Sequence, residues 1–336
     1  MKRLPVLALT TGDPAGIGPE ISLRAAADDE LRRLCRLILI GDASVLEGIR
    51  AASKVDSAIL AFPAEQATAV IGNSPRDGVI ELFDCRTLPH AIPLAMPSEQ
   101  GGAASFAYIR TAIELAQSGI VDGVVTAPVN KLAWSLAGVT QPGHTEVFAE
   151  ETHSDPYAML MYSDKLAVGL VTCHQSLATV PESLTMERIV ATGELLARSI
   201  AKIRGGKVRI AVLGLNPHAG ESGLFGNEER RIISPAVHEL QRRGIDAEGP
   251  LPPDTAFTAK ALARYDAFLC MYHDQGLIPF KMVSFDDGVN VTMGLPFVRT
   301  SVDHGTAYDL AGRGVAGITS MIAAAKLAAR LASRGD

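Results

Sequence analysis

The amino-acid sequence predicts an α/β fold with mostly parallel sheets. Short, almost wholly apolar runs alternate along the chain with longer amphipathic ones. This alternation is typical of strand–helix units, and strands that are apolar on both faces are typical of parallel sheets covered by helices. Glycine and polar clusters follow several of the apolar runs, at the position where open α/β sheets bind their ligands.

The expected strands and helices can be placed from these patterns. The strands are LPVLALTT (4–11), LCRLILIG (34–41), GVVTAP (123–128), KLAVGLVTC (165–173), VRIAVLGL (208–215) and YDAFLCMY (265–272). The helices are PEISLRAAADDELRRL (19–34), ASFAYIRTAIELAQSG (104–119), TMERIVATGELLARSIAKI (185–203), RIISPAVHELQRRG (231–244) and TSMIAAAKLAARLAS (319–333). The sequence shows no internal repeat and no low-complexity linker, so we expect any domain boundary to fall inside ordered structure.

Composition and charge argue against several classes of protein. The chain has 336 residues, 47% hydrophobic and 20% charged, which is enough for a large core. With a formal charge of −6 and no basic run, we expect no nucleic-acid partner. The apolar run near the N-terminus is too short for a signal peptide and none is long enough to span a membrane, so we expect no membrane association. The scattered cysteines fit a reducing, cytoplasmic location: Cys35, Cys85, Cys173 and Cys270.

Three of the eight histidines lie in loops that are expected to follow strands. His174 follows LVTC, His218 follows LGLNP, and His273 follows CMY. Neutral imidazole is a frequent ligand of Zn²⁺ and similar ions, and three protein ligands leave an open position for a substrate. For any one histidine alone, an ordinary hydrogen-bonded loop residue is the favoured interpretation. Three of them at strand ends favour a metal site, but their spacing is too wide for a metal motif, so both interpretations stay open.

Two stretches that open helices are candidates for anion binding. GDPAGIGPE (12–20) follows the first expected strand, and its backbone N–H groups either bind an anion or form a tight strand–helix turn. Its glycine spacing is not that of the dinucleotide-binding fingerprint. In PGHTE (142–146), His144 and Thr145 come just before a helix, and Thr145 is either an N-cap or part of an anion site.

The last third of the chain carries further polar candidates. MYHDQGLIPFK (271–281) places His273 and Lys281 on either side of a turn expected at Gly276 and Pro279. Lys281 begins a series with Asn290 and Arg299 that suits a phosphate or a carboxylate.

SVDHGTAYDLAGRGVA (301–316) surrounds His304 and Asp309 with glycines. Small residues there allow a planar ligand to approach the backbone, or they form a helix C-cap and a turn.

Together these motifs resemble those of the 4-hydroxythreonine-4-phosphate dehydrogenase family, which has a sister group acting on 4-phospho-threonate or erythronate. The likeness extends from GDPAGIGPE to DHGTAYDLAGRG, nearly the whole chain, and includes PGHTE, NPHAGE, YHDQG and VNVTMGLPFVRTSVDHGTA. The two terminal motifs also resemble the GDGIGPE and HGSAPDIAG loops of isocitrate and isopropylmalate dehydrogenases. The resemblance therefore implies their two-lobed α/β fold, with an active-site cleft between the lobes and a non-Rossmann NAD site.

The resemblance also implies an organisation of the chain. Residues 1–135 and 300–336 would form the lobe that contains both termini and the cofactor-binding loops. Residues 136–299 would form the lobe that binds metal and substrate and mediates dimerisation. The family forms homodimers with the active site at the subunit interface.

Roles for individual residues follow from the same likeness. The ligands of one divalent metal (zinc, magnesium, cobalt or similar) would be His174, His218 and His273. The substrate would contact His144, Thr145, Lys281, Asn290 and Arg299. Asp254 and Asp274 would support the metal ligands or take part in catalysis. NAD or NADP would bind at Gly12, Asp13, Gly16, His304, Gly305, Thr306 and Asp309.

The implied reaction is an NAD(P)-dependent, metal-assisted oxidation of the C3 hydroxyl of 4-phosphooxy-L-threonine. The 3-oxo acid would decarboxylate to 3-amino-2-oxopropyl phosphate, a step of pyridoxine 5′-phosphate (vitamin B6) biosynthesis. The alternative substrate is 4-phospho-D-threonate or D-erythronate, which would give dihydroxyacetone phosphate. Two alternatives of other classes are a binding protein for phosphorylated metabolites, without turnover, and a metal-dependent hydrolase.

Overall fold

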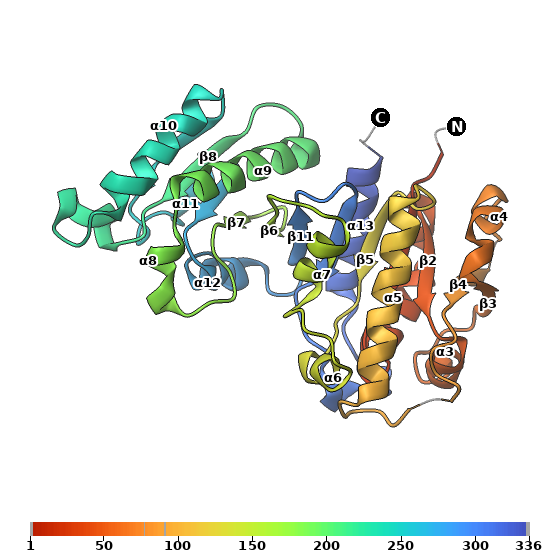
Figure 1. Cartoon of the computed structure of the whole chain (residues 1–336). Helices are drawn as coiled ribbons and strands as arrows, with labels where there is room; N and C mark the ends of the chain where they lie inside the picture. The colour runs from red at the N-terminus through yellow and green to blue at the C-terminus, as the bar shows by residue number, and fades with distance from the viewer. Residues whose placement is uncertain (1–2, 77, 91, 334–336) are drawn as a thin grey trace. The chain divides into compact units, whose positions relative to one another are not determined.

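The computed structural model of the chain describes residues 3–76, 78–90 and 92–333 (Figure 1). It divides into two compact units, unit 1 (Met1–Ser154 and Leu295–Asp336) and unit 2 (Asp155–Gly294). Unit 1 contains both ends of the chain, and its boundaries lie elsewhere than the 135/136 and 299/300 given for the implied lobes. As a result His144, Thr145 and Arg299, expected in the substrate lobe, belong to unit 1.

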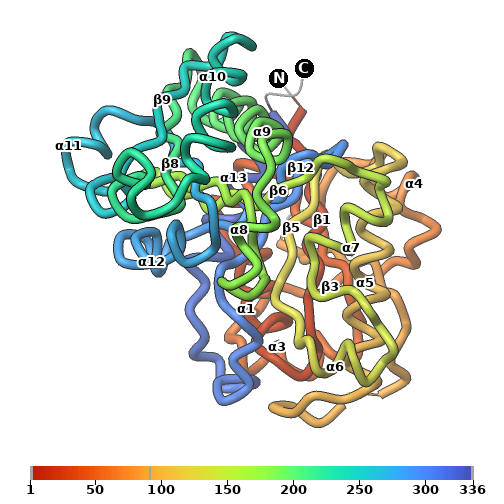
Figure 2. The backbone as a smooth tube through the Cα atoms, turned by 60° about the vertical axis from the view of Figure 1, so that its left-hand side comes forward, coloured from red at the N-terminus to blue at the C-terminus, as the bar shows by residue number. Residues whose placement is uncertain are grey.

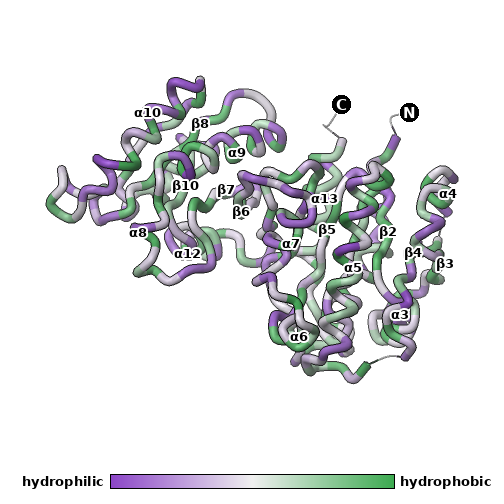
Figure 3. The backbone as a smooth tube through the Cα atoms, viewed as in Figure 1, coloured by the Kyte–Doolittle hydropathy of each residue, from purple (hydrophilic) through white to green (hydrophobic). Residues whose placement is uncertain are grey.

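Unit 1 is built on parallel strands in the order β3-β4-β2-β1-β5-β12. They are β1 (Val6–Thr10), β2 (Arg36–Gly41), β3 (Ala58–Pro63), β4 (Val79–Asp84), β5 (Gly123–Thr126) and β12 (Val298–Val302). Every residue of β1 and β5 is buried, because helices cover both faces of these central strands. The apolar middle of β2 is visible as a green stretch in Figure 3.

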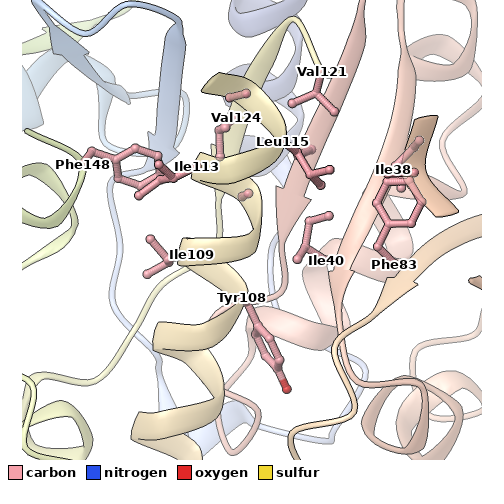
Figure 4. Close-up of a cluster of buried hydrophobic side chains, with 14 of the residues drawn as sticks. Ile38, Ile40, Phe83, Tyr108, Ile109, Ile113, Leu115, Val121, Val124 and Phe148 are labelled. Carbon is pink, nitrogen blue, oxygen red and sulfur yellow. The ribbon is translucent and has the colours of Figure 1, made fainter. Parts of the chain in front are cut away.

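Helices pack on both faces of this sheet. They are α1 (Gly18–Ala26), α2 (Asp29–Leu34), α3 (Ala43–Arg50), α4 (Ala67–Gly72), α5 (Glu99–Gln117), α6 (Lys131–Leu136), α7 (His144–Glu151) and α13 (Thr319–Ala332), with short 3₁₀ turns at Ala64–Gln66 and Tyr308–Leu310. Figure 4 shows Ile109 and Ile113 of α5 in one buried cluster with Val124 of β5. On the other face, Thr300 of β12 donates a hydrogen bond to a carbonyl of α13, at 2.9 Å.

Unit 2 has a mixed sheet with the strand order β11-β6-β7-β10-β8-β9. The strands are β6 (Ala158–Tyr162), β7 (Ala167–Leu170), β8 (Arg209–Leu213), β9 (Asp246–Leu251), β10 (Ala267–Cys270) and β11 (Val289–Met293). The pairs β11–β6 and β6–β7 are antiparallel, and β7, β10, β8 and β9 run parallel. The helices are α8 (Val180–Ser183), α9 (Met186–Arg204), α10 (Ser234–Arg242), α11 (Ala259–Leu262) and α12 (His273–Ser284), with 3₁₀ turns at Leu177–Thr179 and Pro217–Gly223 and a π turn at Glu229–Ile233.

The predicted α/β class and mostly parallel pairing are confirmed, and each of the expected strands is present. The helix expected over 19–34 is instead two helices, α1 and α2. Asp28 causes the break, because its side chain accepts a hydrogen bond from the Leu31 N–H at 2.8 Å and so caps α2.

The turn expected at Gly276 and Pro279 is wrong, because helix α12 runs through both residues. Pro279 removes one hydrogen bond, and the packing of Leu277 and Phe280 into the core of unit 2 keeps the helix in place. Gly276 is needed because a Cβ there would lie 2.3 Å from the Val168 side chain of β7.

Of the two alternatives for Thr145, the structure excludes the N-cap. The cap of α7 is the extended residue Gly143, and Thr145 lies buried in the first turn. Among the described residues no helix is long and apolar enough to cross a bilayer.

Candidate metal, substrate and cofactor sites

The three candidate metal ligands follow three neighbouring parallel strands of unit 2. His174 comes after β7, His273 after β10 and His218 after β8, and β10 lies between the other two strands. The carboxyl ends of parallel neighbours share one edge of a sheet, so the topology brings the three histidine loops to the same edge. The segments that leave β7 and β10 run together, since the Val171 N–H donates to the carbonyl of Cys270, the last residue of β10, and the Thr172 N–H donates to that of Met271.

Within one chain the three imidazoles do not meet at a point. The rings of His174 and His273 are adjacent, with centroids 5.5 Å apart. His218 instead lies against Asp254 and Phe225. The part of the chain that the structure describes holds no group of three or more His, Cys, Asp or Glu side chains that could bind a metal ion.

The chemistry of the donor set nevertheless fits a divalent metal. Nδ1 of His273 lies 2.7 Å from Oδ1 of Asp274, and Nδ1 of His218 lies 3.4 Å from Oδ2 of Asp254. A carboxylate on one ring nitrogen is the usual support of a metal-binding histidine, because it fixes the tautomer and leaves the other nitrogen for the metal. The two acids predicted to support the ligands therefore lie beside two of the three histidines.

A buried amide joins the His218 and His273 segments. Gln275 accepts a hydrogen bond from the Met271 N–H at 2.7 Å and donates one to the Gly214 carbonyl at 2.8 Å. Its side chain thus connects the start of α12 to the root of the loop that carries His218. The identity of residue 275 gives no sequence signal for this role, because its partner lies 61 residues away.

Lys281 and Asn290, two of the expected substrate contacts, also lie in unit 2. Lys281 is eight residues beyond His273 on α12, hence about 12 Å further along the helix axis, and its ammonium is 5.9 Å from the Phe285 ring centre. Asn290 lies in β11, and its Oδ1 is buried without a hydrogen-bond partner among the described residues. A buried acceptor without a partner is costly, which is consistent with a ligand that supplies a donor.

Arg299, His144 and Thr145 are brought together in unit 1. Arg299 is almost fully buried in β12, where its Nη2 donates to Thr126 Oγ1 at 2.7 Å and its guanidinium lies 5.4 Å from the Phe148 ring centre. Phe148 and the two other candidates all belong to α7. Burial lowers the pKa of Arg299 to about 9, so the guanidinium keeps its charge at neutral pH.

His144, in contrast to Arg299, is an uncharged side chain. Its ring lies 5.7 Å from that of Trp134, and its Nε2 is buried with no hydrogen-bond partner in the described part of the chain. Burial, followed by repulsion from Arg299, holds the pKa of His144 well below its usual value. A charged group and a neutral one therefore lie side by side, which suits an anion that also presents a hydroxyl group.

The two terminal motifs, expected to bind the cofactor, meet in unit 1. The Ile17 N–H donates to the Thr306 carbonyl at 3.0 Å, and a Cβ at Gly16 would lie 2.9 Å from that same oxygen. Figure 2 shows the blue segment after β12 returning beside α1. Tyr308 donates a hydrogen bond at 2.7 Å to Asp13, whose other carboxylate oxygen accepts the Ala15 N–H.

The GDPAG loop is a strand–helix turn and not an anion cradle. The N–H groups of Asp13, Ala15, Gly16 and Ile17 are all used within unit 1. Gly12 turns this loop with φ of +71°, and a Cβ there would lie 2.3 Å from the Pro128 carbonyl oxygen. These residues can contribute to a cofactor site through the shape of the loop, not through free amides.

The DHGTAYD segment is the more open of the two loops. Gly305 and Asp309 are exposed, and no atom lies within 4 Å of a Cβ built at Gly305. His304 donates a hydrogen bond from Nδ1 to the Gly305 carbonyl at 3.1 Å, and its Nε2 is buried with no partner among the described residues. An open backbone beside a buried nitrogen of this kind fits a bound ligand such as a nicotinamide cofactor.

The sequence does not reveal the side chains that hold these loops. Gln275, Tyr308 and Glu229 are not among the expected site residues, although each makes buried or partly buried hydrogen bonds to a loop that carries them. Tyr308 lies inside the recognised DHGTAYD motif, and Glu229 closely follows NPHAGE. Their positions within or next to these motifs are the only features of the sequence from which their supporting role could have been predicted.

Comparisons with known proteins agree with the resemblance. The family model for "Pyridoxal phosphate biosynthetic protein PdxA" matches residues 33–328. The chain is 44% identical over 330 residues to a 4-hydroxythreonine-4-phosphate dehydrogenase of Geobacter metallireducens, covering 98% of this chain and 96% of that protein. It is 42% identical over 327 residues to a D-threonate 4-phosphate dehydrogenase of Salmonella typhimurium, covering 97% and 98%. The crystal structure of a 4-hydroxythreonine-4-phosphate dehydrogenase from Klebsiella pneumoniae superposes with a TM-score of 0.87 at 40% identity and 98% coverage of both chains.

Proposed function

Because the chain belongs to the pyridoxal phosphate biosynthetic protein PdxA family, we propose that it is an NAD(P)-dependent dehydrogenase of 4-phosphooxy-L-threonine. The C3 hydroxyl is oxidised: the C3 hydrogen leaves as hydride to the nicotinamide, and the hydroxyl proton is lost. The resulting 3-oxo acid loses carbon dioxide to give 3-amino-2-oxopropyl phosphate, in vitamin B6 biosynthesis. The observation that carries the proposal for this chain is the set of three histidine loops at one edge of the unit 2 sheet.

His174, His218 and His273 are the proposed metal ligands. The support comes from their shared sheet edge and from the carboxylates of Asp254 and Asp274 beside two of the rings. A divalent ion held there would lower the pKa of the C3 hydroxyl and polarise the forming carbonyl. The roles of the protein are to fix the tautomers of the imidazoles and to orient the substrate oxygens.

Arg299 and Lys281 are the proposed phosphate contacts. A phosphate dianion needs cationic partners when it leaves water, and Arg299 remains charged at neutral pH despite its burial. The neutral His144 offers its buried Nε2 to a hydroxyl or phosphate oxygen. Thr145 and Asn290 are proposed to complete the polar contacts with the substrate.

The nicotinamide cofactor, NAD or NADP, is proposed to bind at the joined terminal motifs of unit 1. It supplies the hydride acceptor, and the chain supplies the surface that orients it. The support is the open backbone at Gly305 and the buried Nε2 of His304. Gly12, Asp13, Gly16, Thr306 and Asp309 shape or line this loop pair.

A homodimer is proposed to complete the metal site. Ile278 and Met282 of α12 and Phe285, its C-cap, form an apolar stripe with exposed fractions of 61, 82 and 72%. Large apolar residues at helical spacing on a surface are typical of a protein interface. Since one chain does not gather three ligands in its described part, a second copy placed against this stripe is the proposed source of the missing imidazole.

One experiment tests the reaction and the substrate together. The purified protein, supplied with a divalent metal and NAD or NADP, is given 4-phosphooxy-L-threonine, 4-phospho-D-threonate or 4-phospho-D-erythronate, and reduced cofactor is followed by its absorbance. We expect the highest kcat/KM with the amino acid and a phosphorylated aminoketone as product. No reduced cofactor with any substrate, together with tight binding of the phosphorylated compounds, would instead identify a binding protein.

The threonate reaction is the second candidate, since relatives with both names match at similar identity over nearly the whole chain. The two substrates share the phosphate and the C3 hydroxyl and differ only in an amine or a hydroxyl at C2. Formation of dihydroxyacetone phosphate at the higher kcat/KM would assign the chain to this second reaction.

A further inference from the structure

We infer that Glu229 is a positioning residue for His218, and that its buried carboxylate shapes the loop which presents this imidazole to the metal. The inference rests on the proposed function, because it takes His218 to be a metal ligand. It concerns a residue outside the ligand set, located in the π turn that precedes α10.

The His218 loop has an unusual backbone that requires external support. The five consecutive residues His218 to Ser222 have positive φ values of 51, 53, 81, 43 and 58°. Only one of them, Gly220, is a glycine, and L-residues rarely adopt this conformation. Such a run persists only where the surrounding structure determines it, and strained segments of this kind concentrate at functional sites.

Glu229 supplies that support at the start of the loop. One of its oxygens, Oε1, accepts the backbone N–H groups of Leu215 and Asn216 at 2.8 and 2.7 Å. The other, Oε2, accepts the Asn216 side-chain amide at 3.0 Å. The side chain is 5% exposed, so these bonds are made away from water and fix the backbone just before Pro217 and His218.

The carboxylate also packs within the loop. A Cβ at Gly220 would lie 2.6 Å from Oε2 of Glu229, and a Cβ at Gly214 would lie 3.1 Å from Oε1. The loop is therefore folded around the carboxylate, and glycines lie at two positions where its backbone comes close to the carboxylate oxygens. In the part of the chain that the structure describes, Glu229 makes no ion pair, so its negative charge favours a cation bound by the same loop.

The adjacent Glu228 offers a matched control. Its Oε2 accepts the same Asn216 side-chain amide, at 2.8 Å, but its backbone hydrogen bonds are to Asn227 and to its own N–H, outside residues 214–222. Replacing Glu228 by Gln removes an equal charge from the neighbouring position and leaves the backbone contacts of Glu229 intact. A difference between the two variants thus isolates the positioning role from the loss of one negative charge.

The test is a metal titration of the full-length protein with Co²⁺, followed by visible absorption, in wild type, Glu229→Gln, Glu229→Ala and Glu228→Gln. Glu229→Gln keeps the side-chain shape, but its amide would face the Asn216 amide donor. We expect this variant to bind Co²⁺ roughly 10-fold or more weakly, with an altered spectrum, as for other residues that support metal ligands. Glu228→Gln should stay within about twofold of wild type.

A second measurement does not depend on metal or activity. Hydrogen exchange of the 214–223 peptide should be faster in metal-free Glu229→Gln than in metal-free wild type, because the two backbone N–H groups lose part of their acceptor. NAD affinity should be unchanged in all variants. If Glu229→Ala fails to fold, the Gln variant and its exchange rates still decide the question.

The His218→Ala variant distinguishes failure of the role inferred for Glu229 from failure of the proposed assignment of His218 as a metal ligand. Wild-type Co²⁺ affinity and spectrum in both Glu229 variants, together with loss of affinity in His218→Ala, would overturn the role of Glu229 alone. Wild-type binding in His218→Ala would overturn the assignment of His218 as a ligand, and the inference with it.

Discussion

Burial lowers the pKa of two neighbouring basic residues, Arg299 and His144, but leaves them in different charge states. Arg299 begins with so high a pKa that burial, which brings it to about 9, leaves the guanidinium protonated at pH 7. His144 begins near neutrality, so the same effect, strengthened by the positive Arg299, leaves it uncharged. One fixed cation beside one neutral imidazole is therefore a consequence of the local packing.

Replacement of Arg299 should penalise the phosphorylated substrate selectively. Arg299→Ala should lower kcat/KM for it by about 10- to 150-fold, since a charge-assisted hydrogen bond contributes about 1.5–3 kcal/mol. Arg299→Lys should recover only part of this, because an ammonium cannot form two parallel bonds to a phosphate. The measurement compares kcat/KM for the phosphorylated and dephosphorylated substrates.

Arg86→Ala is the control, since Arg86 is an exposed residue of the same unit whose ion pair with Asp84 is 3.6 Å long. It should leave both values unchanged. An equal loss on both substrates in Arg299→Ala would mean that Arg299 acts on structure or chemistry rather than on the phosphate.

The lowered pKa of His144 predicts a specific sensitivity to acid. Unfolded His144 binds a proton below pH of about 6.5, whereas the folded residue stays neutral, so the unfolded state binds more protons and stability is lost as pH falls. At pH 5.5 the free energy of unfolding lost through His144 reaches up to about 1.4 kcal/mol. The urea midpoint should therefore fall less between pH 7.5 and 5.5 in His144→Gln than in wild type. An identical fall in both proteins would show that His144 is protonated in the fold.

At the scale of the loops, the joined terminal motifs predict a selective effect on the cofactor. A side chain at Gly305 meets no atom within 4 Å, so Gly305→Val should keep the wild-type Tm. It should raise the KM for NAD or NADP at least about tenfold, because the valine occupies the space proposed for the cofactor. Gly317→Val is the control, since Gly317 is exposed in the same unit with equally open surroundings. Cofactor titrations that match wild type in Gly305→Val would place the nicotinamide elsewhere.

Many of the apolar elements could be predicted from the sequence, although the fully buried strand β6 was not, and the weakly patterned elements could not. The buried strands β1, β5 and β10 are short apolar runs and were expected. The sheet-edge strand β3 is half exposed, and β9 contains glycine and proline, so neither differs clearly from a loop in its pattern. Helix α12 was obscured by Gly276 and Pro279, which are turn signals that packing overrides here.

The candidate site divides in the same way. Residues proposed to carry the chemistry, such as His218 and Arg299, could be selected from the sequence because their types and motifs are characteristic. The side chains that support them, Glu229 and Gln275, bond to backbone atoms of other segments. Almost every residue type has the same backbone N–H and C=O groups, so the type of the partner residue does not indicate the contact. Only the three-dimensional structure reveals these contacts.

For the whole molecule, the exposed stripe of α12 predicts a dimer that depends on Met282. This residue is 82% exposed, so Met282→Glu should leave the fold of one chain intact and place a charge in the proposed interface. Sedimentation equilibrium should show a dimer for wild type and mostly monomer for the variant. Metal analysis should show less bound metal in the variant than in wild type. Met96→Glu, at a 53% exposed methionine of unit 1, should remain dimeric. A dimeric Met282→Glu variant would exclude this stripe as the interface.

Shared ligands can be tested by mixing inactive chains. Heterodimers formed from His174→Ala and His218→Ala chains regain one intact site only if these two ligands come from different subunits. The same holds for each of the other two pairings with His273→Ala. Absence of recovered activity in every pairing would mean that one subunit supplies the complete ligand set.

The course of the chain between its units has a consequence for protein engineering. Unit 2 is one continuous segment, Asp155–Gly294, and Ala158 at its start pairs with Met293 at its end in the β6–β11 ladder. Gly294 passes so close to Pro156 that a Cβ there would lie 2.3 Å from the Pro156 oxygen. An insert whose two ends adjoin can be cut out and replaced as a cassette without stretching its host, as in natural domain insertions. Chimaeras that carry residues 155–294 of a relative should thus fold, and would permit the unit with the proposed metal ligands to be exchanged independently of the unit with the proposed cofactor loops.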